Sequence, residues 1–370
     1  MRRRAVRAVL AVLACIGVCV ASPVAAQTSH PHALRAHAAG LVEGVGRFRH
    51  VVVLTEENEG AATTWASTSP AVYLRSLRSK GVFLPNYYGT GHVSLDNYIA
   101  MVSGQLLTPL TASDCLAVSL WTCVQGQSLQ RQGLNLGDQL EAAGLSWRAY
   151  ADGATTPCFH GPYKVGDLTP DPYQGDSTTG AKNFADRHNP FLYFPDIIGN
   201  ATRCAAHQRR IADLATDIAA NRLPAFSFIT PDTCHDGHDN PCAGSTVGGL
   251  TTADAWLRAT LPNLLTYLAA NNGLLVINFD EGSVPPSPTG LVTTPSDYLC
   301  TSCVSLGIGG RTGALLISPR LPHGAVVTTG YDHYSLLRTI EDSFGIGQYL
   351  NMAAFAHPMT AAFAGLKAFS

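Results

Sequence analysis

The sequence predicts an α/β fold with a mostly parallel central sheet and helices on both faces. Four short runs rich in β-branched and aliphatic residues indicate buried strands, at residues 50–58, 225–230, 274–282 and 314–319. Helical patterns lie between them, at residues 135–144, 209–222 and 254–273. Strands that alternate with helices in this way are typical of a parallel sheet that is covered on both sides.

A further helix is predicted within residues 87–105, YYGTGHVSLDNYIAMVSGQ. Apolar residues recur at helical spacing from Leu95 to Val102, so Ser94 falls at the expected N-cap. Gly89 and Gly91 are expected to permit a tight turn before it. Ser94 has two interpretations: serine is a preferred helix cap, but N–H groups at a helix start also bind phosphate oxygens, which would suit a nucleophile.

The N-terminus has the pattern of a secretory signal peptide. Four arginines precede a short apolar run that ends in small residues at 24–26, which predicts cleavage after Ala26 and a secreted protein. A transmembrane anchor is the alternative, but the apolar run is short and ends at Pro23. We expect a signal peptide at 1–26, a leader or linker at 27–45, and a single domain at 46–370 without a stable membrane anchor.

Eight cysteines remain after the signal segment. An even number in an exported chain favours disulfides over metal thiolates. Proximity in the sequence suggests three pairs and leaves two cysteines for a fourth: Cys115–Cys123, Cys234–Cys242, Cys300–Cys303 and Cys158–Cys204. A structural zinc site is disfavoured because the paired CxxC arrangement is missing.

The charge of the chain argues against a nucleic-acid partner. Loss of the signal segment moves the formal net charge from −2 to about −6, and no basic run suggests a polybasic membrane tether. The expected partner is therefore a small-molecule or lipid-borne substrate rather than a charged polymer.

Polar groups follow three of the predicted strands, at the strand ends where open α/β sheets bind ligands. Adjacent carboxylates that close buried strands repel each other unless a cation lies between them. The carboxylate and amide oxygens suit Mg²⁺, Ca²⁺ or Mn²⁺, whereas Zn²⁺ prefers some histidine, and the identity stays open among these four ions. We predict one divalent cation, with the ligands Glu57, Asn58, Asp280 and Glu281.

Three histidines are candidates for a second role. His235 and His238 form an HxxH pair that could bind metal, although without a helical pattern. His238 lies beside Asp239, and such a carboxylate favours an imidazolium that contacts phosphate or donates a proton. His333 heads a predicted helix, where it is either a cap-region residue or functional. Residues 152–200 are rich in Pro, Asp, Gly and aromatics, and we expect a long ordered loop near the site.

Five ordered motifs resemble the phosphoesterase family of secreted bacterial phospholipases C and acid phosphatases, within the alkaline-phosphatase-like superfamily. They are HVVVLTEEN, NYYGTGHVSLDNYIAMVSGQ, FITPDTCHDGHD, LLVINFDEG and YDHYSLLRTIEDSFG, between about residues 49 and 345. RHNPFLYFPDII and GGLTTADAWLRATLP are similar to actinobacterial secreted acid phosphatases, some of which act on phosphoinositides. The resemblance implies an alkaline-phosphatase-like fold and a cation held by the four ligands above, with Ser94 as the nucleophile. It also implies phosphoryl contacts from His92, His238 and His333.

The sequence departs from the family pattern at two positions. Acid phosphatases of the family often have His-Pro-Ser where this chain has His92-Val93-Ser94, and His235 replaces another polar residue, so it is left outside the predicted set. Glu56 is expected to be only a neighbour of Glu57.

The resulting prediction is a secreted, metal-assisted phosphomonoesterase with a serine nucleophile, an acid phosphatase that could act on phosphoinositides. A phospholipase C-type phosphodiesterase is the enzymatic alternative, disfavoured because the chain lacks the additional C-terminal domains that many such enzymes have. A non-catalytic phosphate or lipid binder is the third possibility, but it would leave the serine, the cation ligands and the histidines without a use.

Overall fold

The computed structural model describes residues 44–115, 123, 134–161, 183–282 and 299–369. Its centre is an eight-stranded sheet in the order β5-β4-β6-β1-β7-β8-β2-β9, and a two-stranded ladder pairs β10 with β3. The strands are β1 His50–Glu56, β2 Gly81–Leu84, β3 Tyr87–Tyr88, β4 Trp147–Ala151, β5 Gln208–Arg210, β6 Phe226–Thr230, β7 Gly273–Phe279, β8 Ala314–Ile317, β9 Ala325–Val326 and β10 Tyr331–Asp332.

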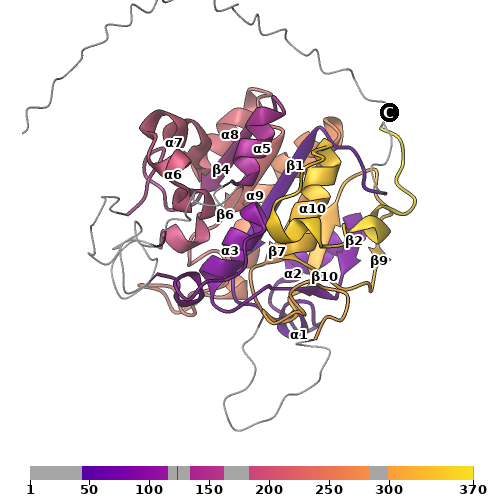
Figure 1. The fold of residues 1–370 in the computed structure, drawn as a ribbon. Coiled ribbons are helices and arrows are strands. Elements are labelled where there is room, and N and C mark those ends of the chain that lie inside the picture. The colour runs from indigo at the N-terminus through magenta and orange to yellow at the C-terminus, as the bar shows by residue number, and fades with distance from the viewer. Residues whose placement is uncertain (1–43, 116–122, 124–133, 162–182, 283–298, 370) are drawn as a thin grey trace, which may run out of the picture. The chain divides into compact units, whose positions relative to one another are not determined.

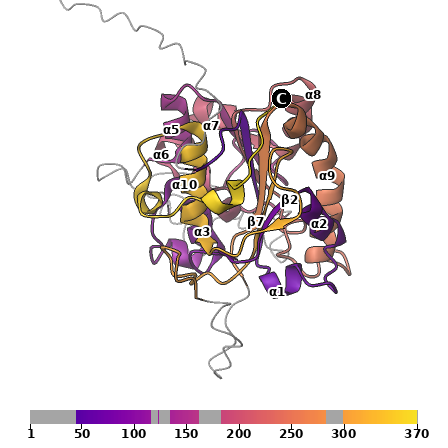
Figure 2. The same ribbon diagram turned by 90° about the vertical axis from the view of Figure 1, so that its right-hand side faces the viewer.

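Helices cover both faces of this sheet, and Figure 2 shows the sheet nearly edge-on between them. One face carries α3 Ser94–Ser103, α5 Leu136–Ala142, α6 Pro195–Ile198, α7 Ala201–His207 and α10 His333–Phe344. The other face carries α2 Val72–Ser76, α8 Ile211–Ala219 and α9 Leu250–Ala270, and the short α1 Ala61–Thr64 follows β1 (Figure 1). The predicted α/β class, with its mostly parallel sheet and two helical layers, is confirmed.

Two hydrophobic clusters, one on each face of the sheet, hold the layers together. Alternate residues of β1 supply them: Val51 and Val53 pack under α3 and α10, whereas Val52 and Leu54 pack under α9. Both faces are buried, which explains why β1 and β7 are continuous apolar runs rather than alternating patterns.

The four predicted strands are present, and one runs in an unexpected direction. β8 pairs antiparallel with both β7 and β2, although its sequence has the same apolar character as the parallel strands. Full burial of its four residues explains the resemblance, because burial on both faces selects the same residues in either direction. The strands β2, β4, β5 and β9 were not predicted, because the last two are very short and the first two lack a long β-branched run.

The parallel strands β1, β6 and β7 end at the same edge of the sheet, so their following residues come together there. β1 pairs with β7 from His50 to Glu56, and with β6 from Val51 to Leu54. The segment 183–200, predicted as loop, contains short helical turns that include η3 Asp186–His188 and η4 Pro190–Tyr193. Within the described part of the chain, no helix is both long and apolar enough to cross a bilayer. The predicted signal segment lies outside the described residues.

Candidate active site

Ser94 is the first residue of α3, and its side chain contacts an acid rather than the helix backbone. Val93 takes the N-cap position, while the Ser94 hydroxyl donates a 2.8 Å hydrogen bond to Oε2 of Glu57. The free N–H of Leu95 is bonded instead by Oδ1 of Asp114, at 2.8 Å. The cap interpretation of Ser94 is therefore wrong, and its hydroxyl lies at the C-terminal edge of the sheet.

The turn that delivers Ser94 is built around Asn97. The Asn97 side chain accepts hydrogen bonds from the N–H groups of Thr90 and Gly91 and donates to the carbonyls of Gly91 and Val93, at 2.7–3.1 Å. Gly89 is required by close packing: a Cβ there would lie 2.7 Å from the Asp280 carbonyl oxygen. The turn is thus fixed against the end of β7, which supports the predicted importance of the glycine.

Glu57, Asn58 and Asp280 meet Ser94 at the ends of β1 and β7. Oδ1 of Asp280 accepts a 2.9 Å hydrogen bond from the Asn58 N–H, and the Asn58 amide lies 3.4 Å from Oε2 of Glu57. Both carboxyl groups are fully buried. Burial, together with the charges of Asp280 and Asp236, raises the pKa of Glu57 well above its usual value. Burial and the neighbouring Glu281 raise the pKa of Asp280 to about 7.

The unpaired oxygens of these acids fit a hard cation. Oδ2 of Asp280 is buried and has no hydrogen-bond partner among the described residues, and Oε1 of Glu57 makes no hydrogen bond of standard geometry there, although Nε2 of His188 lies 3.2 Å from it. Burial of an ionised carboxylate lowers the stability of the folded protein unless a positive charge compensates it. Glu281, the fourth predicted ligand, instead contacts Nδ1 of His92, and burial and Asp114 raise its pKa to about 8. Three of the four predicted ligands therefore surround Ser94, and the fourth lies beside His92.

The three predicted phosphoryl-contact histidines differ in what their rings can do. His92 has one ring nitrogen on Glu281, while its Nε2 is buried with no hydrogen-bond partner among the described residues. His238 has Nδ1 2.9 Å from Oδ1 of Asp239, as the sequence predicted. Its Nε2 lies 3.3 Å from the Arg187 guanidinium, so a neutral ring with the proton on Nδ1 satisfies both contacts. His92 and His238 thus line the site.

His333 is the first residue of α10, as predicted, and its ring is fully buried. Its Nδ1 lies 2.9 Å from the Tyr87 hydroxyl, and its Nε2 lies 2.5 Å from the carbonyl oxygen of Asp280. Burial lowers the pKa of the ring to about 4. The predicted phosphoryl contact of His333 would require one of these two contacts to break.

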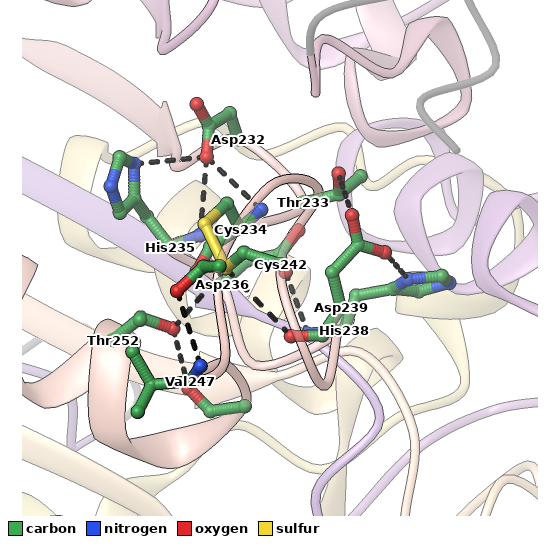
Figure 3. The surroundings of a disulfide bond; sticks show 12 residues. Asp232, Thr233, Cys234, His235, Asp236, His238, Asp239, Cys242, Val247 and Thr252 are labelled. Atoms are coloured by element: carbon green, nitrogen blue, oxygen red, sulfur yellow. Dashed lines mark hydrogen bonds and ion pairs between the residues drawn. A yellow bond between two sulfur atoms is a disulfide. The ribbon is translucent and has the colours of Figure 1, made fainter. Parts of the chain in front are cut away.

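The HxxH pair does not form a joint metal site, since the two rings point away from each other across the Cys234–Cys242 disulfide (Figure 3). His235 Nδ1 lies 2.9 Å from Asp232 and 3.1 Å from Asp152. In the described part of the chain, these are the only three His, Cys, Asp or Glu residues whose ligand atoms all lie within 4.8 Å of one another. Hydrogen bonds to both acids raise the pKa of His235 to about 10, so its imidazolium already supplies the positive charge there.

Two site residues escaped the sequence analysis, the adjacent Arg187 and His188. Both are buried, in the turn η3. The His188 ring lies 3.2 Å from Glu57 through Nε2 and 3.2 Å from Asp236 through Nδ1. Burial first, and then the charges of Arg187 and His238, lower the pKa of His188 well below its usual value. A signal was available, because an Arg-His pair inside the aromatic run of residues 184–194 has to bury polar groups within a core.

The four predicted disulfides are all formed: Cys115–Cys123, Cys158–Cys204, Cys234–Cys242 and Cys300–Cys303. The third closes the loop that carries His235, Asp236 and His238 (Figure 3). The disulfide pattern therefore fixes part of the site as well as the periphery.

A profile of the Phosphoesterase family matches residues 61–347, which is most of the chain. The chain belongs to the phosphoesterase family. The match confirms the family resemblance predicted from the motifs, and it spans the turn of Ser94, the Asp280 strand end and the His333 helix. Ser94 and Asp280 lie within the matched range, whereas Glu57 precedes it.

Curated relatives are similar to this chain over most of its length. A probable acid phosphatase from Kluyveromyces lactis is 25% identical over 314 residues, 82% of this chain and 60% of the relative. A phosphatidylinositol-3-phosphatase from Mycobacterium tuberculosis is 27% identical over 63% of this chain and 64% of its own length. Phospholipase C B from the same species is 26% identical over 56% of this chain. The chain spans less than two thirds of the length of each.

Solved structures confirm the fold. A protein of the alkaline phosphatase superfamily from Vibrio parahaemolyticus superimposes with a TM-score of 0.53 at 12% identity, over 83% of this chain and 68% of its own. A sulfatase from Pseudoalteromonas gives a TM-score of 0.50 at 13% identity, over 88% of this chain and 74% of its own. The expected alkaline-phosphatase-like architecture is thus correct.

Proposed function

We propose that this phosphoesterase is a secreted, metal-assisted phosphomonoesterase that uses Ser94 as its nucleophile. One observation carries the proposal: the Ser94 hydroxyl is bonded to the buried Glu57, while the neighbouring Asp280 keeps its buried Oδ2 without a hydrogen-bond partner among the described residues. A plain structural serine needs no such acid pair. The named relatives, an acid phosphatase and a phosphoinositide phosphatase, support a phosphate monoester as substrate.

Glu57, Asn58 and Asp280 would hold the cation, with Glu281 as a fourth ligand once it turns from His92. A hard divalent ion in this place supplies positive charge that lowers the pKa of a serine hydroxyl and stabilises charge on phosphoryl oxygens. Oxygen-only ligands favour Mg²⁺, Ca²⁺ or Mn²⁺. Burial and neighbouring acids raise the pKa of Glu57 well above its usual value and that of Asp280 to about 7, and a bound cation would compensate the charge of both groups.

The reaction steps fall to residues of the chain. The Ser94 hydroxyl transfers its proton to Oε2 of Glu57, to which it is already bonded, and its oxygen attacks phosphorus in line with the leaving group. The bond from phosphorus to the ester oxygen breaks, and that oxygen takes a proton from Nε2 of His92, whose Nδ1 faces Glu281. Water then attacks the phosphoserine and gives a proton back to His92, while the Ser94 oxygen leaves phosphorus and takes back the proton held by Glu57, so that inorganic phosphate is released and the hydroxyl is restored. In this proposal His92 binds a phosphoryl oxygen through Nε2, which has no hydrogen-bond partner among the described residues.

A substrate panel with and without chelator tests this proposal. We expect phosphate release from monoesters, including nucleotides, sugar phosphates and phosphoinositides, and a loss of that activity in chelator. Turnover of a phosphodiester at a higher rate than any monoester would favour the phospholipase C alternative, which the similarity to phospholipase C B keeps open. Binding of phosphate esters without turnover would overturn both and leave a binding protein.

Export is part of the proposal and has its own test. The N-terminal signal pattern and the four disulfides both suit an oxidising compartment. Expression of the full sequence should release protein into the culture medium, and its N-terminal residue should be Gln27 after cleavage of the signal peptide. Retention of the uncleaved chain in the membrane fraction would favour the anchor alternative.

A further inference from the structure

His188 occupies a position that the reaction steps above do not use. It is 1% exposed, and both its ring nitrogens lie 3.2 Å from a buried carboxylate oxygen: Nε2 from Oε1 of Glu57, and Nδ1 from Oδ2 of Asp236. The contacts are close polar contacts rather than hydrogen bonds of standard angle. Glu57 uses its other carboxylate oxygen for Ser94. The imidazole of His188 thus contacts one carboxylate oxygen of Glu57, while the other oxygen accepts the hydrogen bond of Ser94.

The surroundings of His188 fix the plane of its ring. The ring stacks on Tyr98 of α3, with centroids 5.2 Å apart and an interplanar angle of 12°. Its own turn is held by the Asn189 side chain, which donates a 2.7 Å hydrogen bond to the carbonyl of Ala185. Asp236, on the far side, is tied to the same strand end, because its carbonyl accepts a 2.7 Å hydrogen bond from the Glu57 N–H. The His188 ring, Glu57 and Asp236 are therefore linked to one another by direct contacts.

We propose that His188 is the positioning residue of Glu57: clamped between Asp236 and Tyr98, it sets which oxygen of Glu57 faces Ser94 and the cation. Carboxylates that bind metal ions depend on such outer partners for orientation, and loss of a partner typically costs about 10–100-fold in metal affinity or activity. The proposal rests on the proposed function, since it assigns a role only if Glu57 is a cation ligand. The positioning role does not require contact between His188 and the substrate.

Two substitutions separate positioning from mere packing. The side-chain amide of asparagine reaches the place of Nδ1, whereas that of glutamine reaches the place of Nε2, the nitrogen that touches Glu57. We expect His188→Asn to weaken Mg²⁺ or Mn²⁺ binding about 10–100-fold, and His188→Gln to recover much of that loss. Isothermal titration of the full mature protein measures the affinity directly, without turnover.

His207 offers a matched control. Its ring also stacks on an aromatic residue, Trp147, with centroids 4.2 Å apart, and its Nε2 also lies 3.2 Å from a carboxylate, that of Glu141. Trp147 begins β4, at the opposite end of the strand from the site. His207→Gln should leave the cation affinity unchanged, which shows that loss of a stacked histidine alone does not affect the site.

The outcomes are distinguishable. If the parent protein binds no divalent cation, the proposed function fails and this inference with it. If the parent binds and folded His188→Asn binds equally well, or if the asparagine and glutamine variants lose affinity alike, the positioning role is wrong while the function stands. If neither variant folds, Asp236→Asn keeps the imidazole and weakens its anchor. A several-fold loss of cation affinity in that variant supports the role, and an unchanged affinity overturns it.

Discussion

Removal of one charge from the Glu57–Asp280 pair should stabilise the cation-free protein and destroy its response to cations. In the absence of a cation, burial and Glu281 raise the pKa of Asp280 from its ordinary 3.8 to about 7. The folded state therefore holds a proton that the unfolded state has already lost. Stability contributed by this group is present at low pH and is lost as the pH rises from about 4 to about 7. Asp280→Asn removes the titrating group, so the variant should not lose this stability as the pH rises.

The size of the effect follows from the pKa values. One pKa unit corresponds to about 1.4 kcal/mol, so the change from 3.8 to about 7 corresponds to roughly 4 kcal/mol above neutral pH, as an upper limit because neighbouring acids respond. The Asn58 N–H keeps its acceptor in the variant, since an amide oxygen replaces Oδ1. We therefore expect cation-free Asp280→Asn to be more stable than the parent by about 2–4 kcal/mol at pH 8 and nearly equal to it at pH 4.

Thermal unfolding in chelator and in excess Mg²⁺ or Mn²⁺, at pH 4 and pH 8, measures the predicted gain in stability and the predicted loss of cation response. A ligand present at about a hundred times its Kd stabilises the folded state by about 2.7 kcal/mol. The parent protein should gain that stability from the cation and the variant should gain much less. Asp217→Asn is the control: it removes the negative charge that faces Arg148 and the Tyr150 hydroxyl, on the face of the sheet opposite α3, and should be destabilised equally in both media.

The opposite pattern would refute the reasoning. If cation-free Asp280→Asn at pH 8 is less stable than the parent, the two acids are not in electrostatic conflict. If the variant is stabilised by cation as strongly as the parent, Asp280 is not a ligand.

Three further predictions concern the nucleophile, the turn and the disulfides. Ser94→Ala should lower kcat by at least about a thousandfold while costing about 1 kcal/mol or less in stability. Ser103→Ala, which removes the other buried serine of α3, should keep activity; equal losses in enzymatic assays of the two variants would contradict the nucleophile. Gly89→Ala should lower both the melting temperature and the activity, because its Cβ would lie 2.7 Å from the Asp280 carbonyl oxygen, whereas Gly347→Ala, whose Cβ meets nothing within 4 Å, should change neither; a fully active Gly89→Ala enzyme would refute the close packing. Reduction should lower the melting temperature, since each disulfide typically contributes about 2–4 kcal/mol, and titration of eight free thiols in the unreduced protein would contradict the pairing.

The sequence predicted the core of the fold because burial leaves a direct mark on composition. β1 and β7 are long, fully buried and apolar, so their positions and the acids that follow them were evident. The direction of β8 was not, because a four-residue buried strand carries the same residues in either orientation. The edge strands β5 and β9 have three and two residues, too few for a period to show.

The site was predicted in part for the same physical reason. Ser94, Glu57, Asn58 and Asp280 lie next to regular elements, and their order along the chain is enough to bring them together. His188 arrives from a segment without helical period, through contacts that only the tertiary fold creates. His333 was correctly placed at a helix start, but the pairing of β3 with β10, which brings its ring to Tyr87 and the Asp280 carbonyl, was not evident from the sequence.

The most direct test of the central claim is detection of a phosphoryl group on Ser94. Rapid acid quench during turnover of a phosphate monoester, followed by peptide mass spectrometry, should find phosphoserine in the peptide that contains Ser94 and none in the Ser94→Ala protein. Turnover at an undiminished rate by folded Ser94→Ala, or a phosphoryl group trapped on another residue, would contradict the account.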